Sequence, residues 1–278
     1  MTLTDSHFKR LTDFILEESG NIISINNKSI LEMKLLNLLD ELEIENIDEL
    51  IFKLVKNDEY VKQRLIETIT IHETRWFRDK TFSKLVNETL MPAWVKELRE
   101  NKLKTINIWS AAASSGQEIY SMIILISEYL STNLILDIDL SRFKFYATDL
   151  SESVLAKAKA GCYSQYEINR GCKDNILEKY FDLNGKDYCF KPKYRNLVHF
   201  QQQNLLESIG LNTSFDYVMC RYVLIYFEKE TKLEVIEKIS KKLRSNGILL
   251  LGGSEMYLEY AKLFDKISIG VGNYYVKK

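Results

Sequence analysis

Four residues with charged or hydrogen-bonding side chains lie within two positions of the end of a predicted strand. Asp149 ends a strand within "FKFYATDL", Asn204 follows the next strand, and Arg221 and Tyr222 follow a strand that ends at Cys220. A carboxylate suits a ribose diol, because it accepts hydrogen bonds from two adjacent hydroxyl groups. An amide such as Asn204 can read an adenine edge or a neighbouring backbone. Ligands of open α/β sheets bind beyond the carboxyl ends of the strands, so we expect these residues to meet at one edge.

The loop "AAASSGQE" (residues 111–118) indicates a nucleoside ligand without phosphate groups. It joins a buried strand to a helix, where dinucleotide-binding domains carry a GxGxxG pattern, yet Gly116 is its one glycine. A dinucleotide oxidoreductase is therefore disfavoured. Small Ala and Ser residues let a ligand approach the backbone without wrapping a pyrophosphate. S-adenosylmethionine is the common ligand of this kind, and Glu118 is placed for its polar end. The alternative interpretations are helix capping by Asp149, a helix-dipole role for Glu118, a buried ion pair for Arg221 and a core position for Tyr226.

The segment "ETITIHETRWFRD" (residues 67–79) combines two aromatic residues with two arginines. Linkers are usually small and polar, so this composition is unusual for a connection between domains. Arg78 could hold a carboxylate in a bidentate pair, and Trp76 and Phe77 could close over a ligand. The alternative is that the two aromatic residues only dock the domains.

The elements that must position these residues follow two patterns. In the first seventy residues apolar side chains recur at helical spacing, with Ser29 and Asp48 as candidate helix starts. From about residue 104, strands alternate with helices, which indicates a mostly parallel, doubly wound sheet. The predicted strands are Thr105–Ser110, Lys144–Thr148, Leu197–Gln202, Tyr217–Cys220 and Ile248–Gly252. The predicted helices are Glu118–Tyr129, Ser153–Ala160 and Glu230–Arg244, the last stopped by Asn246-Gly247.

Residues 181–200 do not fit this alternation. Asn184-Gly185 is a hairpin turn signal flanked by strand-like residues, which predicts an antiparallel excursion. We therefore expect a helical N-terminal domain over residues 1–70 and an α/β domain over residues 71–278. The second domain would begin with a linker at residues 71–80 and carry a β-subdomain insertion at about residues 181–200.

The composition is that of an ordinary globular chain of 278 residues with a net charge of −1, which argues against general affinity for nucleic acid or anionic membranes. No secretory signal and no bilayer-length apolar stretch is visible, so we expect a cytoplasmic protein without membrane insertion. The four cysteines form no CxxC pair, so we expect reduced thiols and no metal. Residues 1–70 hold eight Lys/Arg against fourteen Asp/Glu, so this part is net acidic.

Six motifs follow one another along the chain: "IHETRWFRD", "IWSAAASSGQEIYSM", "ATDLSESVLAKAKAGCY", "NLLE", "FDYVMCRYVLIYF" and "GGSE". This series resembles the CheR-type chemotaxis receptor (protein-glutamate O-) methyltransferases. The resemblance runs from about residue 5 to the C-terminus. It implies an all-α domain followed by a Rossmann-like, doubly wound S-adenosylmethionine-dependent methyltransferase domain that carries a small antiparallel β-subdomain.

The resemblance also implies an activity and a set of site residues. The expected reaction transfers the methyl group of S-adenosyl-L-methionine to glutamates in the cytoplasmic domains of membrane chemoreceptors, as part of chemotaxis adaptation. The products are methyl esters and S-adenosyl-L-homocysteine, and we expect the enzyme to be a monomer. The implied catalytic residues are Arg78 and Tyr226. The implied cofactor-binding residues are His72, Thr74, Arg78, Glu118, Asp149, Asn204, Leu205, Arg221 and Tyr222.

The chain departs from the family pattern at four of the compared positions. His72 and Tyr222 stand where asparagine is usual, Gln117 replaces an acidic residue and Ile119 replaces a proline.

A glutamate carboxylate is roughly 99% ionised at pH 7, so the implied reaction needs no general base. Two alternatives are a non-catalytic module that binds S-adenosylmethionine or docks partners, and a carboxyl methyltransferase acting on another substrate.

Overall fold

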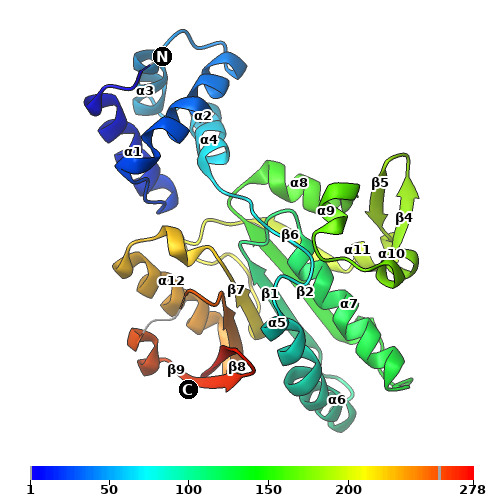
Figure 1. Ribbon diagram of the computed structural model, residues 1–278. Helices are drawn as coiled ribbons and strands as arrows, with labels where there is room; N and C mark the ends of the chain where they lie inside the picture. Colours follow the sequence, from blue (N-terminus) through cyan, green and yellow to red (C-terminus); the bar gives the residue numbers. More distant parts are fainter. Residues whose placement is uncertain (1, 256–257) are drawn as a thin grey trace. The chain divides into compact units, whose positions relative to one another are not determined.

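The computed structural model describes residues 2–255 and 258–278 (Figure 1). The chain divides into two compact units. The first unit contains Met1–Ile71 and Tyr226–Glu234, and the second contains His72–Ile225 and Val235–Lys278. None of the described helices combines the length and the apolar character needed to cross a membrane.

The first unit is built mainly from short α-helices, as the apolar spacing predicts. They are α1 (Asp5–Ser19), α2 (Lys28–Glu41), α3 (Ile47–Val55) and α4 (Glu59–Ile69), with the 3-10 helix η1 at Ile25–Asn27. Each α-helix contributes a leucine with no exposed surface to a shared core. These leucines are Leu11, Leu35, Leu50 and Leu65.

Two predicted helix starts in this unit are wrong by a short distance. α2 begins at Lys28, one residue before Ser29, directly after the 3-10 helix η1. α3 begins at Ile47, because the side chain of Asn46 rather than Asp48 accepts the backbone N–H of Glu49 and caps the helix.

The second unit is organised around a seven-stranded sheet in the order β6-β2-β1-β7-β8-β10-β9. Neighbouring strands from β6 to β8 are parallel, and the last two strands form an antiparallel hairpin beside β8. This arrangement confirms the predicted doubly wound sheet and adds the C-terminal hairpin, which the alternation does not predict. The strands are β1 (Ile106–Ala111), β2 (Phe143–Asp149), β6 (Val198–Gln202), β7 (Phe215–Cys220), β8 (Leu243–Leu251), β9 (Phe264–Ile269) and β10 (Gly272–Lys277).

Helices pack on this sheet and bury its apolar residues. α7 contacts β1 and β2, and α8 contacts β2 and β6 (Figure 1). The strand β1 is buried along its whole length, as expected for the centre of a parallel sheet. The helices are α5 (Lys80–Leu85), the π-helix η2 (Val86–Leu90), α6 (Met91–Glu100), α7 (Gln117–Thr132), α8 (Glu152–Ala160) and α12 (Lys229–Lys242), with 3-10 helices η3 (Leu140–Arg142), η4 (Leu224–Tyr226) and η5 (Leu258–Lys262).

The predicted stop of the last long helix is wrong. α12 ends at Lys242, and Asn246-Gly247 lies inside β8 instead of ending a helix. Asn246 takes a left-handed backbone conformation (φ 61°), and the register between β7 and β8 shifts next to it. Asparagine tolerates this conformation, so the pair makes an irregularity in the strand rather than a helix cap.

A three-stranded antiparallel sheet in the order β3-β5-β4 forms the small subdomain. The predicted hairpin is β4 (Phe181–Asn184) and β5 (Asp187–Phe190), joined at Gly185. The third strand, β3 (Cys162–Ser164), comes from before the predicted insertion. The helices α9 (Gln165–Asn169), α10 (Asp174–Tyr180) and α11 (Pro192–Arg195) flank these strands in the chain.

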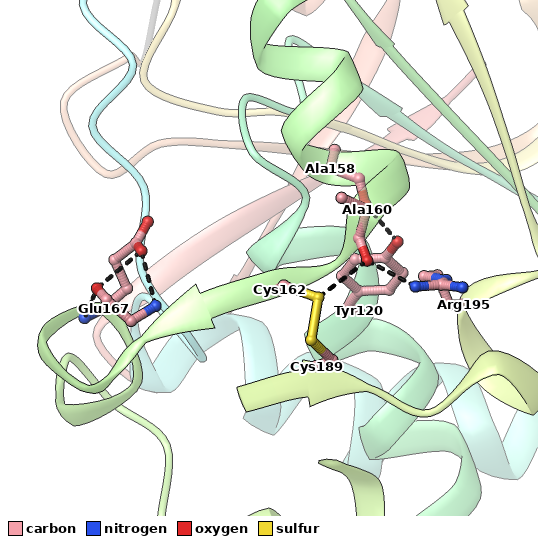
Figure 2. Close-up of a disulfide and its surroundings, with 8 residues drawn as sticks. Tyr120, Ala158, Ala160, Cys162, Glu167, Cys189 and Arg195 are labelled. Atoms are coloured by element: carbon pink, nitrogen blue, oxygen red, sulfur yellow. Dashed lines mark hydrogen bonds between the residues drawn. A yellow bond between two sulfur atoms is a disulfide. The ribbon is translucent and has the colours of Figure 1, made fainter. Parts of the chain in front are cut away.

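The expectation of four reduced cysteines is wrong, because Cys162 and Cys189 form a disulfide (Figure 2). The two residues are direct partners in the register of β3 and β5, and their Cα atoms are 4.0 Å apart. The neighbouring pair is hydrogen-bonded, with the Phe190 N–H donating to the Gly161 carbonyl over 2.8 Å. The cysteines therefore occupy a non-hydrogen-bonded position, where side chains on facing strands lie closest.

We expect the double substitution Cys162→Ser/Cys189→Ser to lower the free energy of unfolding by about 3–4 kcal/mol, because the disulfide closes a long loop in the unfolded chain. The cysteines are 27 residues apart. Urea unfolding with and without reductant measures the change, and Cys172→Ser, at a free cysteine, is the matched control. Four titratable thiols in denatured, unreduced protein would contradict the pairing, since it leaves only Cys172 and Cys220 free.

Candidate functional site

The carboxyl ends of four strands meet at one edge of the large sheet. Ala111 at the end of β1 pairs with Thr148 of β2 and with Cys220 of β7, and Cys220 pairs with Leu251 of β8. Strand order reverses at β1, because β2 and β6 lie on one side of it and β7 and β8 on the other. Open α/β sheets bind their ligands at such a switch point. The register thus brings the residues that follow these strands to a common edge.

The loop between β1 and α7 turns sharply without a glycine-rich sequence. Ala112 (φ 61°) and Ser114 (φ 50°) take left-handed conformations, and Gly116 (φ 91°) does so just before α7. For residues other than glycine this conformation costs about 1–2 kcal/mol each. Backbone strain of this kind gathers at functional sites. The short side chains leave the loop backbone open to close approach by a ligand.

Asp149 organises this loop from the end of β2. Its Oδ2 accepts the backbone N–H of Ser114 (2.8 Å), and its Oδ1 accepts the N–H of Ser151 (3.1 Å). The residue is buried, and burial raises the pKa of Asp149, against the lowering effect of these N–H donors and of His72 nearby. A carboxylate has about four acceptor positions, so both oxygens keep capacity for further donors such as ribose hydroxyl groups.

Arg221 is the centre of a buried charge cluster directly after β7. Its guanidinium pairs with Glu118 of α7 and with Asp79, and only 1% of its side chain is exposed. Burial by itself would lower the pKa of Arg221, but Glu118 and Asp79 raise it above its ordinary value. Ser110 also donates to Glu118, over 3.5 Å. Two predicted cofactor-binding residues, Glu118 and Arg221, therefore hold each other in place.

Arg78 and Tyr222 form a second contact beside this cluster. The guanidinium carbon of Arg78 lies 3.6 Å from the centroid of the Tyr222 ring, within the range of a cation–π interaction. Arg78 also donates to the Glu73 carbonyl oxygen over 2.8 Å. The Tyr222 hydroxyl donates to Asp79 over 3.3 Å. Tyr222 thus links Arg78 to the cluster around Arg221.

The linker that carries Arg78 is fixed within the second unit. Trp76 is 1% exposed, and its ring makes edge contacts with Tyr163 (5.0 Å) of β3 and Phe181 (5.2 Å) of β4, both in the small sheet. A Cβ at Gly171 would lie 2.2 Å from the Trp76 carbonyl oxygen, so this contact requires glycine. Trp76 therefore anchors the linker and does not close over a ligand.

The other predicted cofactor-binding residues lie in the same unit. The carbonyl of His72 accepts the Ser114 hydroxyl over 3.0 Å, which connects the linker to the β1–α7 loop. Thr74 is half-buried in the linker. Asn204 follows β6, where its side chain accepts the Leu206 N–H over 3.0 Å, and Leu205 is buried.

Tyr226 belongs to a different compact unit from the other predicted site residues. It ends η4 and belongs to the first unit, where its carbonyl accepts the Ile22 N–H over 2.9 Å. The geometry of the second unit therefore does not test its assignment as an active-site residue, which stays a prediction.

Asp79 is a residue that the sequence-based reasoning gave no role. Its Oδ1 caps α5 by accepting a hydrogen bond from the Phe82 N–H over 2.8 Å. Its Oδ2 accepts hydrogen bonds from the Arg221 guanidinium and the Tyr222 hydroxyl. The capping position is visible in the sequence, but Arg221 is 142 residues away and no local pattern could reveal that pair. In residues 2–255 and 258–278, no group of His, Cys, Asp and Glu could hold a metal ion.

Comparisons with known proteins show which family this chain resembles over most of its length. The family described as CheR methyltransferase, SAM binding domain, matches residues 72–272. A chemotaxis protein methyltransferase of Pseudomonas aeruginosa is 33% identical over 260 residues, which cover 92% of each chain. A relative with the same description from Vibrio anguillarum is 31% identical, over 100% of this chain and 99% of its own. A third, from Pseudomonas putida, is 31% identical over 92% of each chain.

Proposed function

Because the chain belongs to the CheR methyltransferase family, we propose that it methylates glutamate side chains of membrane chemoreceptors with S-adenosylmethionine, giving glutamate methyl esters. The observation that carries this proposal is the corner at the ends of β1, β2 and β7, where Asp149, a small-residue loop and Arg221 converge. The expected partners are the cytoplasmic domains of the receptors, which a monomer would reach from the cytoplasm.

The residues at this corner fit S-adenosylmethionine. Asp149 retains acceptor capacity for the ribose hydroxyl groups, and the loop at Ala112–Gly116 presents little side-chain bulk to the adenosine. Asn204 and Leu205 would border the adenine. Glu118 lies in the first turn of α7 and would accept a hydrogen bond from the amino group of the methionine part. The ion pair with Arg221 would keep the Glu118 carboxylate oriented.

The proposed chemistry requires alignment rather than proton transfer. When bound, S-adenosylmethionine supplies a methyl group on a positively charged sulfur. The glutamate nucleophile is already ionised at pH 7, so the chain needs no general base. Holding the reactants in line can contribute about 7–11 kcal/mol to lowering the barrier. His72, Thr74, Arg78 and Tyr222 would supply this alignment on the linker side, and Tyr226 would offer a neutral hydrogen bond.

The surroundings of Arg78 support a positioning role. The reaction neutralises a carboxylate and a sulfonium, so a cation that gripped the attacking oxygen would stabilise the ground state more than the transition state. Arg78 rests on the Tyr222 ring and on a backbone carbonyl. We therefore assign it to orienting the cofactor or the substrate, without a tight clamp on the nucleophile.

A methyl-transfer assay tests the proposed function. Purified protein is incubated with S-adenosylmethionine labelled in its methyl group and with receptor cytoplasmic fragments, and base-labile volatile label is counted. The control fragment carries glutamine at the methylated positions. We expect label only on the glutamate fragment. Label on other proteins alone would indicate a different carboxyl substrate, and cofactor binding without any transfer would indicate a sensor module.

A further inference from the structure

A buried carboxylate near the C-terminus takes no part in the roles described above. Glu255 is 1% exposed and follows β8 by four residues. Its Oε2 accepts the backbone N–H of Tyr222 over 2.6 Å and that of Gly252 over 2.7 Å. Its Oε1 lies 3.3 Å from the N–H of Ile225. One side chain thus gathers backbone donors from two loops at the same edge of the sheet.

These donors lie close to the ends of two strands, because Tyr222 follows β7, Gly252 follows β8, and Ile225 belongs to the 3-10 helix η4. Tyr222 takes a left-handed conformation (φ 60°) two residues after β7, and its N–H donates to Glu255. A tyrosine in this conformation is strained and persists only where its surroundings fix it. Burial raises the pKa of Glu255, and the backbone donors, Tyr222 first among them, act in the opposite direction.

The Glu255 carboxylate is packed so closely that Gly252 beside it has no room for a side chain. A Cβ added at Gly252 would lie 2.5 Å from Oε2 of Glu255 and 3.0 Å from the Tyr222 ring. Glu255 also closes its own turn, because its N–H donates to the Gly252 carbonyl over 2.9 Å. Glu255 therefore fixes the position of the Tyr222 backbone. The position of the Tyr222 ring follows from this backbone position and from the close packing against Gly252.

The position of the Tyr222 ring determines where the Arg78 guanidinium can lie. The Arg78 guanidinium lies on that ring at 3.6 Å, and the Tyr222 hydroxyl reaches Asp79, which pairs with Arg221. We propose that Glu255 is a positioning residue for methyl transfer, because it fixes through the Tyr222 backbone the aromatic surface on which Arg78 lies. This inference rests on the proposed function and adds to it a residue that touches neither cofactor nor substrate.

The substitution Glu255→Gln tests this role while keeping the shape of the side chain. Its amide nitrogen cannot accept the N–H groups that a carboxylate oxygen accepts, so the loop at Tyr222 must shift. A displacement of about 1 Å can cost about 100-fold in rate. We expect kcat to fall by about 10- to 100-fold, while the dissociation constant for S-adenosylhomocysteine rises by a clearly smaller factor, because Asp149 and Glu118 keep their positions.

Asp216→Asn is the matched control. Asp216 keeps 9% of its side chain exposed and also accepts a backbone N–H, from Asn107 over 2.8 Å, but it lies at the opposite end of β7 and pairs with Arg244 and Lys104. Its substitution should lower stability and leave kcat within about twofold of the wild type, because no loop at the site depends on it.

A double-mutant cycle with Arg78→Ala separates positioning from general destabilisation. If Glu255 acts through Arg78, then Glu255→Gln should lower kcat little further once Arg78 is truncated. Where Glu255→Gln fails to fold, Glu255→Asp, which keeps the charge and shortens the reach, takes its place in the cycle. If the double variant instead lost kcat by the product of the two single-variant factors, this inference would be overturned and the proposed function would stand. A wild type without methyl transfer would contradict the proposed function and this inference with it.

Discussion

Replacing Arg221 with methionine is expected to lower the free energy of unfolding by about 3–5 kcal/mol, because it removes the buried counter-charge of two carboxylates that are themselves only partly exposed. Glu118 is 11% exposed and Asp79 31% exposed at the side chain, and both pair with this one guanidinium. The same change should abolish measurable methyl transfer, since Glu118 loses the partner that orients it. Urea unfolding and the labelled methyl assay measure the two effects.

A triple variant distinguishes the two effects of Arg221. In Arg221→Met/Glu118→Gln/Asp79→Asn no buried charge is left unpaired, and asparagine still caps α5. We expect it to regain most of the lost stability but not the activity. Arg244→Met is the matched control, because Arg244 pairs with Asp216 at 2.8 Å but keeps 37% of its side chain exposed, and Asp216 retains Lys104 at 3.4 Å, so we expect a loss of only about 1 kcal/mol. Equal losses in Arg244→Met and Arg221→Met would contradict the central role of this cluster.

The second large effect is expected for Asp149→Asn, which should weaken binding of S-adenosylhomocysteine by about 100-fold. Hydrogen bonds to a charged group contribute about 1.5–3 kcal/mol each, and the ribose diol would donate two of them. The substitution also turns one acceptor of the Ser114 or Ser151 N–H into a donor, which disturbs the loop. Calorimetric titration measures the affinity, with Asp139→Asn, at the cap of η3, as control. An unchanged affinity would remove Asp149 from the binding site.

Burial of Asp149 also predicts a dependence on pH. Its pKa is raised above the ordinary value of 3.8, so the folded apoprotein takes up this proton at a higher pH than the unfolded chain. The stability contributed by this group is therefore fully present below pH 3.8 and is lost as pH rises through the raised pKa. Ligand affinity has the opposite trend, because the ribose needs the ionised form. We expect affinity to fall on acidification before pH 3.8 is reached, and Asp149→Asn to lose this dependence.

Local sequence patterns predicted the five parallel strands of the sheet and the residues that follow their ends, but not the C-terminal hairpin of β9 and β10. Strand ends at Asp149 and Cys220 are visible because apolar runs stop where polar residues begin, and a parallel sheet aligns those ends whatever the details of packing. The small-residue loop was also recognisable, although its left-handed Ala112 and Ser114 were not, since neither residue type favours that conformation.

The interactions that hold the corner together were beyond local patterns. Arg221 and its partner Glu118 are 103 residues apart, and Glu255 and Tyr222 are 33 residues apart. Cys162 and Cys189 meet only because β3 and β5 pair in one register. Such contacts depend on the tertiary structure, which spacing rules for helices and strands do not describe.

Direct titration of S-adenosylmethionine and S-adenosylhomocysteine into the purified protein tests the central claim, that the corner at Ala111–Gly116, Asp149 and Arg221 holds this nucleoside. We predict saturable binding of both compounds with one site per chain, weakened in Asp149→Asn. No measurable heat of binding for either compound at millimolar concentration, with the protein folded by circular dichroism, would contradict it.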